Sequence, residues 1–187
     1  MLRFETDDAE VVALIHRYLG LLQLAGHPLR VTTSKPIFEE WIGRRVGPIG
    51  GGYIWLPRGR THAVFIDRSR LRPDHPRAVE LVVAEELIHM RDWIDGDRRR
   101  HAKHGYDRIA DKVAALTGAT HDEIRDSLLP VERRPYRWLY ACPGCGATIA
   151  RRRKGTWSCG RCSPRFDKRF VLQLVGEAAP APGELEI

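Results

Sequence analysis

Four cysteines constrain the C-terminal part of the chain more than any other feature of the sequence. They follow the pattern Cys142-x2-Cys145-x13-Cys159-x2-Cys162, as CPGC and CGRC. Each CxxC pair can direct two thiolates at one ion, and the residues between the pairs are enough for a hairpin that completes a tetrahedron. Paired CxxC units in an intracellular protein indicate metal more often than disulfides. We therefore expect a structural zinc ribbon with four cysteine ligands over residues 131–172.

The positive charge of the chain is concentrated in the same segment. Residues 131–170 contain eleven Lys or Arg against two acids, a net of +9, whereas the whole chain carries +7. The remainder is therefore slightly acidic. A basic region of this kind is typical of a protein that binds a polyanion, most often nucleic acid. The alternative is that these residues only form a solvated surface.

One basic run lies between the two cysteine pairs and next to aromatic residues. Arg151, Arg152, Arg153 and Lys154 precede Trp157, and the first pair is preceded by Tyr136, Trp138 and Tyr140. Cations that follow a phosphate backbone, beside aromatic rings on which bases stack, are the usual means of binding single strands. We expect a nucleic-acid site here, with DNA and in particular single-stranded DNA as the candidate. For Trp157, a place in the small core of the ribbon is the alternative.

The first 130 residues predict an α+β domain. Apolar residues at helical spacing begin at Val11, after Asp7 and Glu10, which form a possible capping box, and Gly26 offers a stop. A strand, LRVTT, follows at 29–33, and YIWL and HAVFI form a hairpin around Pro57 and Gly59. The triplet Gly50–Gly52 is not followed by GKS or GKT, so we do not expect a phosphate-binding loop.

Helices are expected in the second half of this domain. Asp74 and Pro76 mark the start of a long helix through Ile94, and Gly118 ends a helix that begins near Tyr106. Thr120 with Glu123 marks a short helix that ends before Pro130. We expect residues 173–187, at the end of the chain, to be a disordered tail.

The long helix contains VVAEELIHMRDW, which differs from the HExxH motif of metalloproteases at one position. In HExxH, two histidines four residues apart bind one ion, and the glutamate beside the first is the general base. Glu85 replaces the first histidine here, while Glu86 and His89 occupy the other two positions. Glu85 can still bind zinc through oxygen. His104 is the expected third ligand, with His101 as a rival.

Taken together, these motifs resemble the SprT-like family of zinc metalloproteases. The motifs are EELIH at 85–89, HG at 104–105, YACPGCG at 140–146, RRRK at 151–154 and CGRC at 159–162. The resemblance covers roughly residues 30–170. It implies a zincin-like (minigluzincin-type) domain with a small β-sheet over the active-site helix, followed by the zinc ribbon. It also implies an active-site metal bound by Glu85, His89 and His104, with Glu86 activating water for hydrolysis of a protein substrate. In some members of the family, that protein substrate is bound to DNA.

The carboxylate at position 85 leaves several alternatives open. It makes the site more negative by one charge, which weakens the metal as a Lewis acid. Two histidines and one carboxylate also bind non-haem iron, so the ion is zinc or another divalent metal. If Glu85 is not a metal ligand, the alternative is that it pairs with Arg98 or Arg99. The expected function is a metal-dependent endopeptidase; the alternative is an inactive pseudoprotease that serves as a nucleic-acid or ribonucleoprotein binding module.

The sequence predicts a cytoplasmic protein that has no membrane partner. No stretch reaches the roughly 18 apolar residues of a membrane span, and the N-terminus lacks the basic-then-apolar order of a secretory signal. Nothing in the sequence indicates the oligomeric state.

Overall fold

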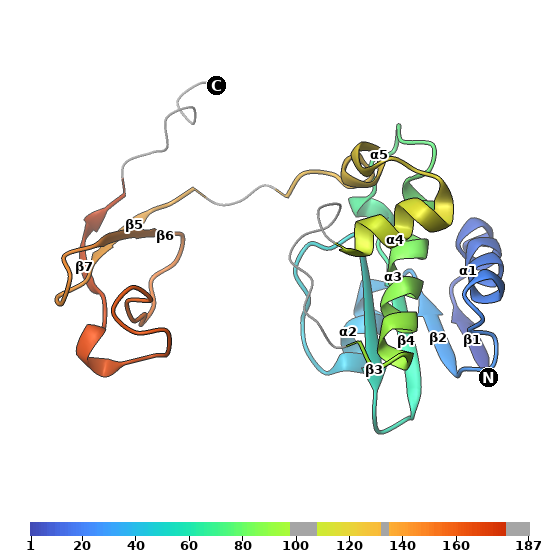
Figure 1. Ribbon diagram of the computed structural model, residues 1–187, viewed down its shortest axis with the longest axis horizontal. Helices are drawn as coiled ribbons and strands as arrows, with labels where there is room; N and C mark the ends of the chain where they lie inside the picture. The colour runs from blue at the N-terminus through green and yellow to red at the C-terminus, as the bar shows by residue number, and fades with distance from the viewer. Residues whose placement is uncertain (98–107, 132–134, 179–187) are drawn as a thin grey trace. The chain divides into compact units, whose positions relative to one another are not determined.

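A computed structural model describes residues 1–97, 108–131 and 135–178 of the chain (Figure 1). The chain divides into two compact units, Met1–Val131 and Glu132–Ile187. In the first, a mixed four-stranded sheet packs with helices, and in the second a small antiparallel sheet carries the four cysteines. The protein is thus α+β, as the sequence predicts.

The sheet of the first unit has the strand order β1-β2-β4-β3. Strands β1 (Leu2–Glu5), β2 (Leu29–Thr32) and β4 (Thr61–Ile66) run parallel, and β3 (Gly51–Leu56) pairs antiparallel with β4. The predicted strand at 29–33 and the predicted hairpin are confirmed. Strand β3 therefore lies at one edge of the sheet, where it can border a site.

Helices cover both faces of this sheet (Figure 1). α1 (Ala9–Leu21) and α3 (Ala78–Ile94) enclose the main core on one face, with α4 (Arg108–Thr117) and α5 (His121–Asp126) packed beyond α3. α2 (Lys35–Ile42) covers the other face through Phe38, which stacks on Phe65. Most of α3 is buried, and its polar residues Glu85, Glu86 and His89 lie on the side of β3.

Several boundaries differ from the predicted ones. Asp8, not Asp7, caps α1, because its carboxylate accepts the backbone N–H of Val11. α3 begins at Ala78, since Pro76 belongs to the preceding turn. Strand β1 and helix α2 were not predicted, because both are short and are stabilised by pairing with β2 and packing on the sheet. The capping box of Thr120 and Glu123 is confirmed at α5.

The second unit is built around β5 (Trp138–Ala141). It pairs antiparallel with β6 (Thr148–Arg151) on one side and with β7 (Gln173–Glu177) on the other. The 3-10 turns η1 (Arg68–Arg70) in the first unit and η2 (Lys168–Phe170) in the second complete the described elements. The prediction of a disordered tail from residue 173 is wrong for 173–177, which form β7; residues 179–187 lie outside the described part of the chain.

Among the helices of the described residues, none is both long enough and apolar enough to cross a membrane.

Candidate metal centres and nucleic-acid interface

The four cysteines meet at one point in the second unit. Their sulfur atoms all lie within 4.8 Å of one another, and the Sγ–Sγ distances Cys142–Cys162 and Cys145–Cys159 are both 3.7 Å. Four thiolates at about 2.3 Å from a tetrahedral zinc ion are separated by about 3.8 Å. The cluster is positioned to bind a structural metal such as zinc.

Backbone turns present both cysteine pairs to this point. β5 ends directly before Cys142, whose carbonyl accepts the N–H of Gly146, a residue in the left-handed region with φ 69°. In the second pair the carbonyl of Cys159 accepts the N–H of Cys162 at 3.2 Å. The N–H groups of Cys162 and Arg161 also lower the pKa of the Cys159 thiol to about 7. A thiolate, the form that binds metal, is therefore favoured there.

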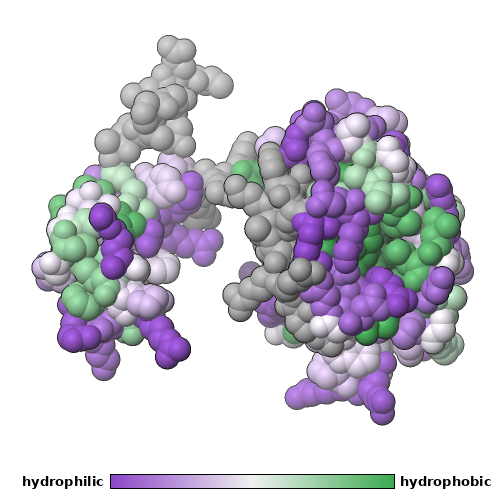
Figure 2. Space-filling view, in the orientation of Figure 1, coloured by the Kyte–Doolittle hydropathy of each residue, from purple (hydrophilic) through white to green (hydrophobic). Residues whose placement is uncertain are grey.

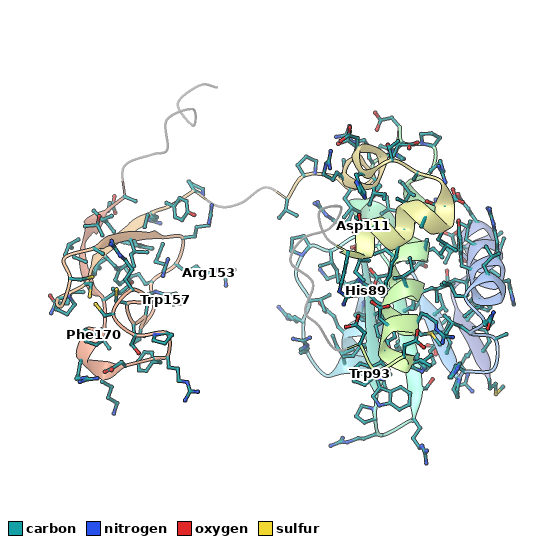
Figure 3. All side chains as sticks on the ribbon, viewed as in Figure 1. His89, Trp93, Asp111, Arg153, Trp157 and Phe170 are labelled. Atoms are coloured by element: carbon teal, nitrogen blue, oxygen red, sulfur yellow. The ribbon has the colours of Figure 1, made fainter. Side chains whose placement is uncertain are left out.

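The candidate active site lies between β3 and α3 in the first unit. A cavity of about 620 Å³ is lined by Gly51–Trp55 of the edge strand and by Glu85, Glu86, His89, Asp92 and Trp93 of the helix, together with Asp97. Figure 3 shows His89 and Trp93 on α3, one turn apart. The structure thus places the three described residues of the predicted motif around one cavity.

Glu85 and His89 stand one turn apart on α3 and approach each other. Glu85 Oε1 lies 3.9 Å from His89 Nε2, and both side chains are largely buried. Oxygen and nitrogen ligands at about 2.1 Å from one tetrahedral zinc ion lie about 3.4 Å apart, so a small rotamer change suffices. This pair therefore fits a divalent cation as two of its ligands.

The expected third ligand lies outside the described residues, and so do its rival and the arginines considered as partners of Glu85. These residues are His104, His101, Arg98 and Arg99. In the described ranges the four cysteines form the only group of three or more side chains arranged to hold a metal.

Glu86 is buried beneath the cavity. Its residue is 6% exposed, and a Cβ built on Gly51 would lie 2.6 Å from Glu86 Oε1. Burial, with a further contribution from the charge of Glu85, raises the pKa of Glu86 well above its usual value. The carboxyl group therefore sits where a proton can be taken up next to the candidate metal ligands.

Sequence reasoning missed Asp92, which fixes this end of α3. Its buried carboxylate accepts hydrogen bonds from Arg108 at 2.6 Å and from Lys112 at 2.5 Å, both on α4. Arg108 also pairs with Asp97 at 3.1 Å. The available signal in the sequence was an aspartate at a helical position that is otherwise apolar. Its partners could not be predicted from the sequence, because they depend on how α4 packs on α3.

Sequence reasoning also missed the aromatic lining of the cavity. Tyr53 and Trp55 project from β3 toward α3, and the rings of Trp55 and Trp93 lie nearly parallel with their centroids 6.5 Å apart. The Tyr53 hydroxyl is hydrogen-bonded to Nδ1 of buried His62 at 2.9 Å. Strand alternation alone puts Tyr53 and Trp55 on one face but does not say which helix they meet.

The predicted nucleic-acid residues form a cationic and aromatic surface on the second unit. Arg152 lies 3.9 Å from the ring centroid of Tyr136, Lys154 lies 4.2 Å from that of Trp138, and Arg151 lies 5.3 Å from that of Trp157. We call this set, with Arg153, the β5–β6 basic face. In Figure 2 strongly hydrophilic residues stand out from the second unit around less hydrophilic ones.

The aromatic residues of this face differ in burial. Tyr140 is part of the ribbon core with Cys142, Cys159 and Leu172, and its hydroxyl accepts the N–H of Gly155. Trp157 does not belong to that core and is 38% exposed. The alternative that Trp157 forms the ribbon core is therefore wrong, and its ring is accessible to a ligand.

Two hollows lie along the β5–β6 basic face. One of about 540 Å³ is lined by Tyr136, Arg137, Trp138, Arg152 and Arg153, with Glu177. A smaller one of about 300 Å³ is lined by Tyr136, Arg151–Arg153 and Trp157. Both combine guanidinium groups with aromatic rings, the pair of groups that contacts phosphates and bases in single strands.

No protein-family model matches the sequence, and no curated protein gives a significant match.

Proposed function

We propose that the protein is a metal-dependent endopeptidase of the SprT-like kind whose ribbon binds nucleic acid. The observation that carries the proposal is the arrangement of Glu85, Glu86 and His89, which line one cavity between a buried helix and an edge strand. A protease site needs metal ligands, a general base and a surface for an extended chain, and each has a candidate here.

The metal ligands and the general base are different residues of this site. Glu85, His89 and, by the resemblance, His104 would hold the ion. A divalent cation bound there would supply Lewis-acid activation of the peptide carbonyl and of water. Glu86 accepts a proton as the water oxygen bonds to the carbonyl carbon, and it returns that proton to the nitrogen as the C–N bond breaks.

The edge strand supports a polypeptide substrate. β3 is bordered only by β4 among the described strands. An extended polypeptide can pair with such an edge, as strands added to a sheet do. A chain bound there runs along the cavity that holds Glu86 and His89.

Metal analysis and one isosteric variant test the proposal. The ribbon accounts for one zinc per chain, and an active site requires a second ion. We expect two metals in the wild type, one in His89→Ala, and two in Glu86→Gln. Hydrolysis of an unfolded protein such as casein should be lost in Glu86→Gln. A single metal in the wild type, or unchanged hydrolysis in Glu86→Gln, would refute this function.

A nucleic-acid binding module with an inactive protease domain is the second candidate. The observation that favours it is the β5–β6 basic face, where four cations and three aromatic rings lie together. In that case oligonucleotide binding is retained while the second metal and hydrolysis are both absent. The same metal analysis, with a titration of single-stranded DNA, therefore separates the two candidates.

A further inference from the structure

We infer that Trp55 and Trp93 form a subsite that takes an aromatic side chain of an extended polypeptide, three or four residues from the bond that is cleaved. The inference rests on the proposed function and adds the substrate preference of the same cavity. We call this pair the tryptophan subsite. Both side chains are partly exposed and line the cavity.

In the tryptophan subsite, the ring of Trp55 packs against a buried neighbour. The ring of Trp55 lies across from His62 in the β3–β4 register, with ring centroids 4.7 Å apart. His62 is 3% exposed, and its Nδ1 is fixed by the hydroxyl of Tyr53. Trp93 comes from a different element, α3. Since Trp55 packs against a buried neighbour, its ring loses little conformational entropy when a ligand binds.

The ring geometry fits an aromatic guest. The interplanar angle of Trp55 and Trp93 is 26° and their centroids are 6.5 Å apart, near the upper end of the range for interacting aromatic pairs. The two rings therefore present a broad apolar surface rather than a closed pair. A third ring can pack on both at once, and such contacts contribute beyond the area that they bury.

The positions of Trp55 and Trp93 relative to Glu86 give the distance from the tryptophan subsite to the bond that is cleaved. Gly51 and Trp55 lie on the same face of β3, and Gly51 contacts Glu86. Four residues of strand span about 13 Å. On α3, Trp93 lies seven residues beyond Glu86, which is about 10 Å along the helix axis. An extended substrate covers that distance in three or four residues.

The charges around the subsite favour a neutral guest over a lysine or arginine. Four acids line the cavity, of which Glu85 and Glu86 lie about two turns of α3 before Trp93. The other two, Asp92 and Asp97, both pair with Arg108, while Lys112 also donates to Asp92. A basic side chain would have to displace these partners to reach a carboxylate. The surface offered to the guest is therefore mainly the two indole rings.

The test measures binding apart from hydrolysis. Full-length Glu86→Gln protein is titrated with labelled twelve-residue Ala/Ser peptides that carry one Phe, one Lys or neither, and fluorescence anisotropy is recorded. We expect the Phe peptide to bind about tenfold more tightly than the peptide without it. Trp55→Ala and Trp93→Ala should each abolish the preference. Equal binding of the Phe and Ala peptides, or a preference for Lys, would overturn the inference.

Matched variants exclude a general loss of structure. Trp55→Phe and Trp93→Phe keep an aromatic ring and should retain most of the preference. Trp41→Phe, on the face of the sheet covered by α2, should leave it unchanged. Loss of the preference in Trp41→Phe would also count against the subsite.

Cleavage by the wild type then tests the register. Mass spectrometry of the products should place the cut three or four residues from Phe, and cuts at scattered distances would refute the assignment. If the Phe preference is present but no peptide is cleaved, the subsite stands and the endopeptidase function fails.

Discussion

Gly51 and Glu86 touch across the boundary between the edge strand and the long helix. A Cβ at position 51 would lie 2.6 Å from Glu86 Oε1 and 2.7 Å from Val82 Cγ1, distances that real Cβ atoms do not adopt. The absence of a side chain at 51 therefore allows β3 to approach α3 at the candidate general base. One glycine of the Gly50–Gly52 triplet thus has a role in packing rather than in binding phosphate.

We predict that Gly51→Ala disturbs the active site. The added methyl group must displace Glu86 or move the strand, and a shift of about 1 Å can cost about 100-fold in rate. Peptide hydrolysis should fall by roughly this factor, with a loss of stability of about 1–3 kcal/mol from overpacking. The measurements are kcat/KM and urea denaturation.

Gly52→Ala is the matched control for Gly51→Ala. Its Cβ would point to the opposite face, 3.3 Å from Ile49 Cδ1 and 3.4 Å from Phe38 Cζ, both ends of side chains. It should retain activity within about twofold. Equal losses in the two variants would show that the triplet is needed for the strand as a whole.

We predict that Glu85→His strengthens the metal site. Imidazole restores the ligand of HExxH and removes one negative charge, so the bound ion becomes a stronger Lewis acid. Hydrolysis near neutral pH should rise by about tenfold, whereas Glu85→Ala should lower metal affinity by about 10–100-fold. Metal affinity is measured by competition with a chromogenic chelator. If Glu85→Ala binds the second metal as tightly as the wild type does, Glu85 is not a ligand.

We predict that the β5–β6 basic face dominates binding of nucleic acid. Changing Arg151, Arg152, Arg153 and Lys154 to Gln should weaken binding of a single-stranded oligonucleotide. The slope of log K against log salt should fall by up to about 3, roughly 0.7 for each lost phosphate contact. Trp157→Ala should weaken binding at all salt concentrations without changing the slope, because stacking releases no counterions.

A control variant removes equal charge from the first unit. Arg44, Arg45, Arg58 and Arg60 are exposed there, and changing all four to Gln should alter affinity and slope far less. Equal effects of the two fourfold variants would show that binding follows net charge alone.

We predict a pH dependence of stability from His62. Burial, with a smaller contribution from His27, lowers the pKa of His62 to about 4 in the folded protein from an ordinary value of 6.5. Between these values the unfolded chain binds a proton that the folded chain does not. The free energy of unfolding should therefore fall as the pH drops from 6.5 to 4, by about 2 kcal/mol at pH 4.5.

His62→Gln should lose this part of the pH dependence. Urea denaturation followed by far-UV circular dichroism at pH 7 and pH 4.5 gives the difference between the variants. His121→Gln, at a residue whose side chain is 49% exposed, should behave as the wild type does. A parallel pH dependence in wild type and His62→Gln would contradict the assignment.

The sequence by itself determined the local features of the protein. Cysteine spacing predicted the four-cysteine cluster that is positioned to bind a metal. Alternation around Pro57 predicted the β3–β4 hairpin, and the order of Glu85, Glu86 and His89 placed three candidate groups on one helix. Each follows from a local rule, since two residues a turn apart on a helix are neighbours whatever the rest of the chain does.

Tertiary structure decided which of these features meet. It brought Gly51 against Glu86, Trp55 beside Trp93, and Asp92 to Arg108, and it extended the ribbon with β7, where a tail was expected. These contacts join residues far apart in the chain, and their partners depend on strand order and helix packing. Local periodicity carries no information on that order, because an edge strand and a central strand can share the same alternation.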